Sequence, residues 1–154
     1  MSGEVQTRIE KLALALPDAP KAGGNYVPAK TIGKIVYLAG VISTVDGAVV
    51  TGTAGLNRTI EDGYAAARAC ALSQLAVLKE HLGSLDKIKQ IVSLNGYVHA
   101  VPGFEDSPKV INGASDLLIE LFGEAGRHVR AAIGVSALPR NALVEIQMTV
   151  ELNS

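Results

Sequence analysis

The sequence predicts an α+β fold in which one mixed β-sheet carries two amphipathic helices on one face. Apolar and polar side chains alternate strictly along residues 143–152, which is typical of a half-buried strand. Between residues 59 and 82, apolar side chains recur every three or four positions, as in a helix that packs against a sheet. The length of 154 residues fits one compact core, so we expect a single domain over residues 1–154.

Residues 1–20 are predicted to form a helical extension of that domain. Between residues 4 and 16, the apolar residues on one helical face are Val5, Ile9, Leu12 and Leu16. Pro17 and Pro20 end the pattern because proline cannot continue a helix. Residues 21–30 contain two glycines, an asparagine and a proline, which predicts a loop with Tyr26 as its one aromatic residue.

The first two strands are predicted to form an antiparallel hairpin. Residues 35–42 (IVYLAGVI) form a continuous apolar run, and residues 48–50 form a second one. Asp46-Gly47 lies between them, and Asp-Gly between two apolar runs is typical of a tight hairpin turn. We therefore expect the two runs to pair with each other.

Two amphipathic helices should cover one face of the sheet. Thr59 is a suitable N-cap for the first helix, which should end at Leu82, before Gly83. Its apolar stripe comprises Tyr64, Ala67, Ala71, Leu75, Leu78 and Leu82. Pro108 precedes the second helix, predicted over residues 109–122. The apolar side of this second helix comprises Val110, Ala114, Leu117 and Leu121.

Three further strands, at residues 88–100, 130–137 and 143–152, complete the predicted order β-β-α-β-α-β-β. One face of the first of these strands should carry Val92, Leu94, Gly96 and Val98. The sheet face away from the helices would then carry Asn95, Tyr97, His99, Glu145 and Gln147. That face is too polar for a core and too apolar for full solvation, so it predicts a subunit interface.

The composition argues against several classes of function. Fourteen Lys and Arg residues nearly balance fifteen Asp and Glu, and aromatic residues make up 4%, so we expect no nucleic-acid partner. No apolar run approaches the roughly 20 residues of a membrane-spanning helix, so no membrane association is expected. Cys70 is the one cysteine and the N-terminus shows no secretion-signal pattern, so we expect a cytoplasmic protein.

No metal or nucleotide motif is recognised. His81, His99 and His128 are scattered along the chain, and Cys70 lies among alanines, where packing is a simpler interpretation than nucleophilic catalysis. The glycines of residues 52–55 lack the spacing of a phosphate-binding loop. We therefore expect neither a metal ion nor an organic cofactor.

Three polar residues remain as candidates for chemistry, each with a simpler alternative. Arg130 opens an apolar strand and offers a planar fork that suits a carboxylate, or it is a solvent-exposed strand end. Glu145 lies in the most regular strand and could orient a water or relay a proton, or it is an ordinary exposed glutamate. Tyr26 could bind or donate through its hydroxyl, or its ring could pin the loop to the core.

Several segments resemble the signature of a known family. Residues 130–139 (RAAIGVSALP), followed by Val144-Glu145-Ile146, resemble the RidA family pattern of an Arg, a short apolar strand, Leu-Pro and a Glu in the last strand. This family is also called the YjgF or reactive-intermediate deaminase family. Residues 24–29 (GNYVPA) resemble its Gly-Pro-Tyr loop, and residues 39–42 (AGVI) resemble its Ser-Gly-Gln-Ile strand end. The resemblance covers nearly the whole chain, which looks like a longer, divergent branch.

The resemblance implies a fold similar to chorismate mutase, with two helices on a mixed sheet, and a homotrimer whose sheets line a central barrel. In deaminating members of the family, the sites lie in clefts between subunits. Enamines or imines such as 2-aminoacrylate are hydrolysed there to 2-oxo acids and ammonia. The expected partner is therefore a small carboxylate substrate, and the expected activity is hydrolysis of a C–N bond without a cofactor.

The resemblance also implies roles for particular residues. Arg130 would bind the substrate carboxylate, Tyr26 would contact the substrate, and Glu145 would position or activate the water. Further expected pocket residues are Gly40, Ala132 and Asn112. Three positions depart from the family pattern: Ala132 stands where a cysteine is frequent, Asn25 replaces the loop Pro, and Val41 replaces the Gln. These departures leave the identity of the substrate open.

Two other functions are compatible with the same residues. A non-catalytic module could bind small carboxylates through Arg130 in the same cleft, and it would be distinguished by binding without turnover. Parts of the family carry the name endoribonuclease, but the near-neutral charge and few aromatic residues disfavour RNA as a partner.

Overall fold

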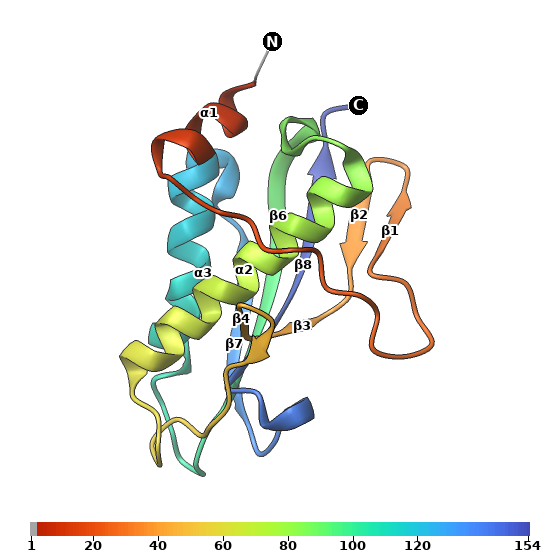
Figure 1. The fold of residues 1–154 in the computed structure, drawn as a ribbon. Coiled ribbons are helices and arrows are strands. Elements are labelled where there is room, and N and C mark those ends of the chain that lie inside the picture. Colours follow the sequence, from red (N-terminus) through yellow and green to blue (C-terminus); the bar gives the residue numbers. More distant parts are fainter. Residues whose placement is uncertain (1–2) are drawn as a thin grey trace.

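A layer of helices packs on one face of a mixed β-sheet in the computed structural model, which describes residues 3–154 (Figure 1). The helices are α1 (Glu4–Lys11), α2 (Ile60–Leu82) and α3 (Ser107–Phe122). The strands are β1 (Ala29–Ile32), β2 (Ile35–Leu38), β3 (Val41–Ile42), β4 (Thr44–Val45), β5 (Ala48–Val49), β6 (Ile88–His99), β7 (Val129–Val135) and β8 (Val144–Leu152). The predicted α+β class is confirmed.

The main sheet has β8 and β6 at its centre. Its strand order is β1-β2-β8-β6-β7, and β3 pairs with β8 beyond the end of β2. The β6 and β7 strands run parallel, whereas β8 pairs antiparallel with β2, β3 and β6. A separate two-stranded sheet contains β4 and β5. The sheet is mixed, as predicted, and β7 forms one of its edges.

The predicted alternation along β8 is confirmed. Its helix-facing side chains are fully buried: Val144, Ile146, Met148 and Val150. The intervening residues Glu145, Gln147 and Thr149 are only half-buried and lie on the other face. Since successive side chains of a strand point to opposite faces, β8 places Glu145 outside the core that the helices cover.

The predicted cap of α2 is confirmed. The backbone N–H of Asp62 donates to Thr59 Oγ1 at 3.0 Å, and the N–H of Thr59 donates to Asp62 Oδ2 at 2.9 Å. These two bonds form a capping box, which satisfies helix N–H groups that lack a partner. At the other end, Gly83 adopts φ +86°, a conformation that favours glycine.

Small residues let α2 and α3 approach each other closely. A Cβ atom on Gly113 of α3 would lie 2.0 Å from the Tyr64 carbonyl oxygen of α2, so no side chain fits there. The predicted apolar side of α3 is buried: Val110, Ala114, Leu117 and Leu121. The α3 helix begins at Ser107 and has Pro108 in its first turn, as its fixed φ permits.

The helix predicted over residues 4–16 is shorter than expected and ends at Lys11. Ala13 adopts φ +52°, and the N–H of Leu14 donates to the Ile9 carbonyl oxygen at 3.0 Å. This geometry is a helix stop of the Schellman type, with alanine in the position that glycine usually occupies. The apolar spacing continues past the helix end because Leu12 and Leu16 still pack against the core.

The prediction that residues 35–42 form one strand was wrong. The run divides at residues 39–40 into β2 and β3, and β2 pairs with β1, a strand that the sequence did not indicate. Asp46 and Gly47 do form a hairpin turn, with φ +51° and +80°, but it joins the short strands β4 and β5. The division places the ends of β2 and β3 beside β8.

One face assignment in β6 was also wrong. Ile91 is buried, whereas Val92 was predicted to share the face of Leu94. A shift in register between Ile91 and Ser93 adds a residue to β6 and reverses the alternation before Leu94. From Leu94 onwards the predicted faces are correct.

The sheet face away from α2 and α3 is semi-polar, as predicted. Half-buried side chains on this face are Asn95, Tyr97, His99, Glu145 and Gln147. Asn95 Nδ2 donates to Gln147 Oε1 across the β6–β8 pair at 3.1 Å. Val129 and Ile133 of the edge strand β7 are 72% and 49% exposed, so apolar area remains uncovered at that edge.

Candidate functional site

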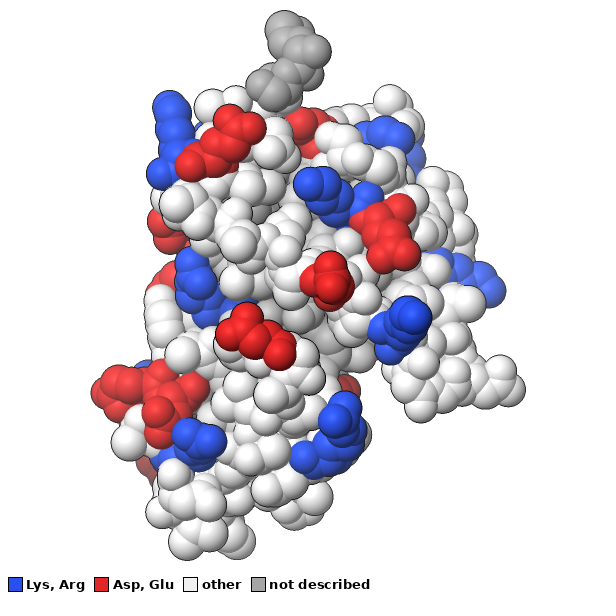
Figure 2. Space-filling view, in the orientation of Figure 1, with Lys and Arg blue, Asp and Glu red and all other residues white. Residues whose placement is uncertain are grey.

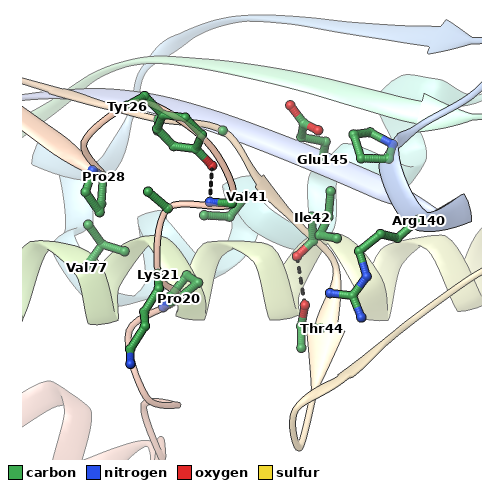
Figure 3. A pocket seen from close by; sticks show the side chains of 15 residues that line it. Pro20, Lys21, Tyr26, Pro28, Val41, Ile42, Thr44, Val77, Arg140 and Glu145 are labelled. Atoms are coloured by element: carbon green, nitrogen blue, oxygen red, sulfur yellow. Dashed lines mark hydrogen bonds between the residues drawn. The ribbon is translucent and has the colours of Figure 1, made fainter.

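A cavity of about 700 Å³ lies where the N-terminal loop crosses the division between β2 and β3 (Figure 3). One wall comes from the loop at residues 20–28, and the other from residues 39–44 and from the turn that precedes β8. Its apolar lining includes Val41, Ile42 and Val77. Its charged lining residues are Lys21, Arg140 and Glu145. A concave apolar site with a few convergent polar groups is the usual form of a small-molecule site.

The carboxyl group of Glu145 lies in this cavity without a partner. Its side chain forms no hydrogen bond or ion pair with any residue from 3 to 154, and it is about half-buried. Burial raises the pKa of Glu145 because a low-dielectric environment disfavours the charged carboxylate. A carboxyl in this state can hold a water molecule and exchange a proton with it.

Gly40 provides the space that this carboxyl group occupies. A Cβ atom on Gly40 would lie 2.6 Å from Glu145 Oε2, so any other residue would displace the carboxylate. The neighbouring strand β3 pairs with β8 in the register Ile42 to Glu145. The division between β2 and β3 therefore brings Gly40 against Glu145.

A buried glutamine from α2 fixes the floor of the cavity. Gln74 Nε2 donates to the Ala39 carbonyl oxygen at 2.9 Å, and the Met148 N–H donates to Gln74 Oε1 at 3.1 Å. Both backbone groups lie where β2 has ended and strand partners are interrupted. Gln74 is fully buried with both ends of its amide bonded, so it replaces the missing ladder contacts.

Tyr26 lines the cavity from the loop. The N–H of Gly23 donates to Tyr26 Oη at 3.0 Å, which folds the ring back over its own loop. The ring is 51% exposed, so the alternative that it pins the loop to the core is not supported. The hydroxyl hydrogen of Tyr26 remains available to donate to a ligand.

Arg130 lies at a different place, between β7 and α3. Its register partner is Leu94, a core residue, so its side chain starts on the helix-covered face of the sheet. The guanidinium donates from Nη1 to Ser115 Oγ at 3.0 Å and from Nη2 to the Pro108 carbonyl oxygen at 3.2 Å. These two bonds hold the planar fork against α3.

Ser115 and His128 extend this arrangement into a hydrogen-bonded chain that sequence reasoning missed. His128 Nε2 lies 2.8 Å from Ser115 Oγ, and His128 Nδ1 lies 2.7 Å from the Gly126 carbonyl oxygen. Burial lowers the pKa of His128, which favours the neutral ring. A neutral ring that donates from Nδ1 accepts at Nε2 from the Ser115 hydroxyl, which in turn accepts from Arg130. Scattered sequence positions gave no signal of this contact.

The six site residues predicted from the sequence divide into two groups. Those that line the cavity are Tyr26, Gly40 and Glu145. Those that lie on β7 or α3 and do not line it are Arg130, Ala132 and Asn112. One chain therefore brings together the loop tyrosine, the strand-end glycine and the carboxyl group, and it leaves the predicted carboxylate-binding arginine outside.

The cavity also contains cations that sequence reasoning missed. Arg140 lines it from the turn before β8, and Lys21 lines it from the loop. Both positions fall in segments that the sequence indicates only as connecting loops. Arg140 and Asn141 both have positive φ, +55° and +59°, a backbone feature that side-chain patterns do not reveal.

Surface charge and buried thiol give no indication of other chemistry. Figure 2 shows Lys, Arg, Asp and Glu interspersed over the face in view, without a continuous basic patch. Cys70 is buried, and burial raises the pKa of its thiol, which agrees with the predicted packing role. Within residues 3–154, no set of three or more His, Cys, Asp or Glu side chains is grouped to hold a metal ion. No helix in that range is long and apolar enough to span a bilayer.

Fold and cavity together define an α+β protein with a concave, partly apolar cavity at the end of its sheet. A family model described as "YjgF/chorismate mutase-like, putative endoribonuclease" matches residues 6–152. The chain therefore belongs to this YjgF/RidA family, as its motifs predicted.

Three individual proteins illustrate the relationship. Protein TCP17 of Trypanosoma cruzi is 41% identical over 155 residues, which cover 99% of this chain and 97% of that protein. A 2-iminobutanoate/2-iminopropanoate deaminase of Dermatophagoides farinae is 29% identical over 140 residues, with 91% and 95% coverage. The crystal structure of the protein Atu1372 from Agrobacterium tumefaciens, of unknown function, is 40% identical with a TM-score of 0.89 and covers 97% of this chain and 92% of that chain.

Proposed function

We propose that this protein is an enamine/imine deaminase that hydrolyses 2-aminoacrylate-like or 2-imino acid intermediates to 2-oxo acids and ammonia. The observation that carries the proposal is the Glu145 carboxyl group, which lies in the cavity without a partner among residues 3–154. Family membership and the similarity to the D. farinae deaminase support the same chemistry.

Glu145 acts on water in the proposed reaction. It holds a water molecule against the imine carbon and takes up a proton as the C–O bond forms. The nitrogen then gains this proton from Glu145. As the C–N bond of the tetrahedral intermediate breaks, the new hydroxyl group gives its proton to Glu145 and becomes the carbonyl of the 2-oxo acid, and ammonia leaves. An enamine substrate enters this reaction as its protonated imine, which forms when its terminal carbon gains a proton. A raised pKa suits this role because a carboxyl exchanges protons most effectively when its pKa approaches the working pH. The reaction is a hydrolysis and changes no oxidation state.

A homotrimer would complete the site, because Arg130 does not line the cavity of its own chain. The exposed apolar side chains of Val129 and Ile133 on edge strand β7 support contact with a second copy there. Arg130 of the partner subunit would then bind the substrate carboxylate. Ser115 and the Pro108 carbonyl group engage two of its N–H groups, and a guanidinium has five.

Hydrolysis of imines from several amino acids tests the proposal. An amino-acid oxidase generates the imine, and the imine that survives is trapped as its semicarbazone. The wild-type protein should lower the semicarbazone yield, and Glu145→Gln should lose about a hundredfold or more of that acceleration. Arg130→Ala should lose it mainly through a higher KM. Glu151→Gln is the matched control because Glu151 lies on the same strand and bonds to Gln90 instead.

A non-catalytic module for small carboxylates is the second candidate. Ala132 favours it, because this position carries no thiol where the family pattern often has one. Retained binding of 2-oxo acids with no acceleration for any imine would establish the module and overturn the deaminase. The family name endoribonuclease gains no support from the mixed surface charge in Figure 2.

A further inference from the structure

Arg140 brings an uncompensated guanidinium to the cavity. It lines the cavity together with Glu145, yet it forms no hydrogen bond or ion pair with any residue from 3 to 154. Four of the other five arginines bond to their own chain: Arg8, Arg58, Arg127 and Arg130. In Figure 3, Arg140 extends from its turn toward Thr44, another lining residue.

The backbone holds Arg140 in a conformation that suits glycine better. Arg140 has φ +55° and Asn141 has φ +59°, so two consecutive residues with a Cβ atom adopt the left-handed region. The turn is fixed on both sides: the Asn141 N–H donates to the Leu138 carbonyl oxygen at 3.1 Å, and the Gly52 N–H donates to the Asn141 carbonyl oxygen at 3.1 Å. The guanidinium is therefore presented from a rigid support.

The charges of the lining leave a place for an anion. Lys21 and Arg140 are positive and Glu145 is negative, so positive charge is in excess even when Glu145 is ionised. In the proposed deaminase, the substrate carboxylate next to the imine carbon binds to Arg130 of the partner subunit. Arg140 would then have no counterpart on a substrate with a neutral side chain. A guanidinium is suited to a bidentate contact with a carboxylate.

We propose that Arg140 selects ligands with a second carboxylate, which are the imines and 2-oxo acids of the aspartate and glutamate type. This inference rests on the proposed function for the position of the first carboxylate. It assigns Arg140 the side-chain carboxylate, while Glu145 keeps its role on water.

Two measurements test the inference. The first is the ratio of kcat/KM for the aspartate-derived imine to that for the alanine-derived imine, which should exceed one and should fall about tenfold in Arg140→Ala. The second is calorimetric binding of 2-oxoglutarate against 2-oxobutanoate, which needs no turnover and should show the same loss of preference. Arg140→Lys should restore part of the preference because the positive charge remains.

Asn141→Gly is the matched control. It changes the neighbouring residue of the same turn, which also has a positive φ, and it leaves the residues that line the cavity unchanged. It should leave the ratio and the binding preference at wild-type values. If the wild type and Arg140→Ala both hydrolysed the two imines with equal kcat/KM, the inference would be overturned while the proposed deaminase activity would stand. Absence of acceleration for every imine would overturn the proposed deaminase activity. The calorimetric comparison would then be the remaining test of whether Arg140 binds a second carboxylate. Equal binding of the two 2-oxo acids, or binding of neither, would overturn the inference.

Discussion

Two regions of the molecule differ in the hydrogen bonding of their polar groups: the cavity rim, with Glu145 and Arg140, and the α3–β7 edge, with Ser115, His128 and Arg130. At the rim, Glu145 and Arg140 lack any hydrogen bond or ion pair with residues 3–154. At the edge, Ser115 joins Arg130 to His128 in a continuous hydrogen-bonded chain. Groups without partners can bind a ligand, whereas groups with partners hold one another in place. In the proposed function, the rim would therefore perform the chemistry and the edge would position an arginine.

Gly40→Ala tests whether the position of the Glu145 carboxyl group at the rim matters for activity. The added Cβ atom would lie 2.6 Å from Glu145 Oε2, so the carboxyl group must move. We expect imine hydrolysis to fall by about tenfold or more, because small displacements of catalytic groups are costly. Gly134→Ala is the control, since its Cβ would meet nothing nearer than 3.6 Å. Equal rates for wild type and Gly40→Ala would show that the carboxyl position is unimportant.

Ser115→Ala tests the edge. The change removes the hydroxyl between Arg130 and His128 and leaves both without that partner. We expect the free energy of unfolding to fall by about 1–3 kcal/mol, measured by urea titration, because Ser115 is buried. A rise in KM with little change in kcat should accompany it if the chain positions Arg130. Ser115→Thr, which keeps a hydroxyl, should restore KM, and failure to do so would contradict the positioning role.

Glu145→Gln separates chemistry from stability at the rim and should have the smallest effect on folding. Because burial raises the pKa of Glu145, the ionised carboxyl is less favourable in the folded protein than in the unfolded chain. Wild-type stability should therefore fall as pH rises from the ordinary glutamate range through the raised pKa, and then level off. Glu145→Gln lacks that loss, so it should be more stable than wild type at pH 7 by less than about 1 kcal/mol. The two proteins should match below pH 4, and a variant less stable at pH 7 would contradict the raised pKa.

The regular elements were predictable because periodicity and caps report local physics directly. Thr59 and Gly83 indicated the two ends of α2, and the alternation of side chains indicated β8. The family motif predicted Glu145, Tyr26 and Gly40 as site residues, and all three line the cavity. The irregular features were not predictable. The division at residues 39–40 depends on a glutamine from α2, and the register shift in β6 depends on its pairing with β8.

The charged part of the site was the least predictable. Arg140 belongs to a turn with two left-handed residues, and neither of them is a glycine that would have marked the conformation. The hydrogen bond between Ser115 and His128 joins α3 to a position 13 residues further along the chain. No spacing pattern in the sequence relates these two residues. Such positions depend on tertiary structure, which a single sequence does not reveal.

Gln74 also determines which parts of the cavity are free to vary. Its amide ties the floor of the cavity to α2, so changes in the strands beneath would disturb the helix layer. Parts of its walls come from residues 20–28 and from Pro139 and Arg140, which lie in connecting segments at the surface. Under the proposed function, ligand preference should therefore change when these two short segments are exchanged, while the strands, helices and Glu145 remain unchanged.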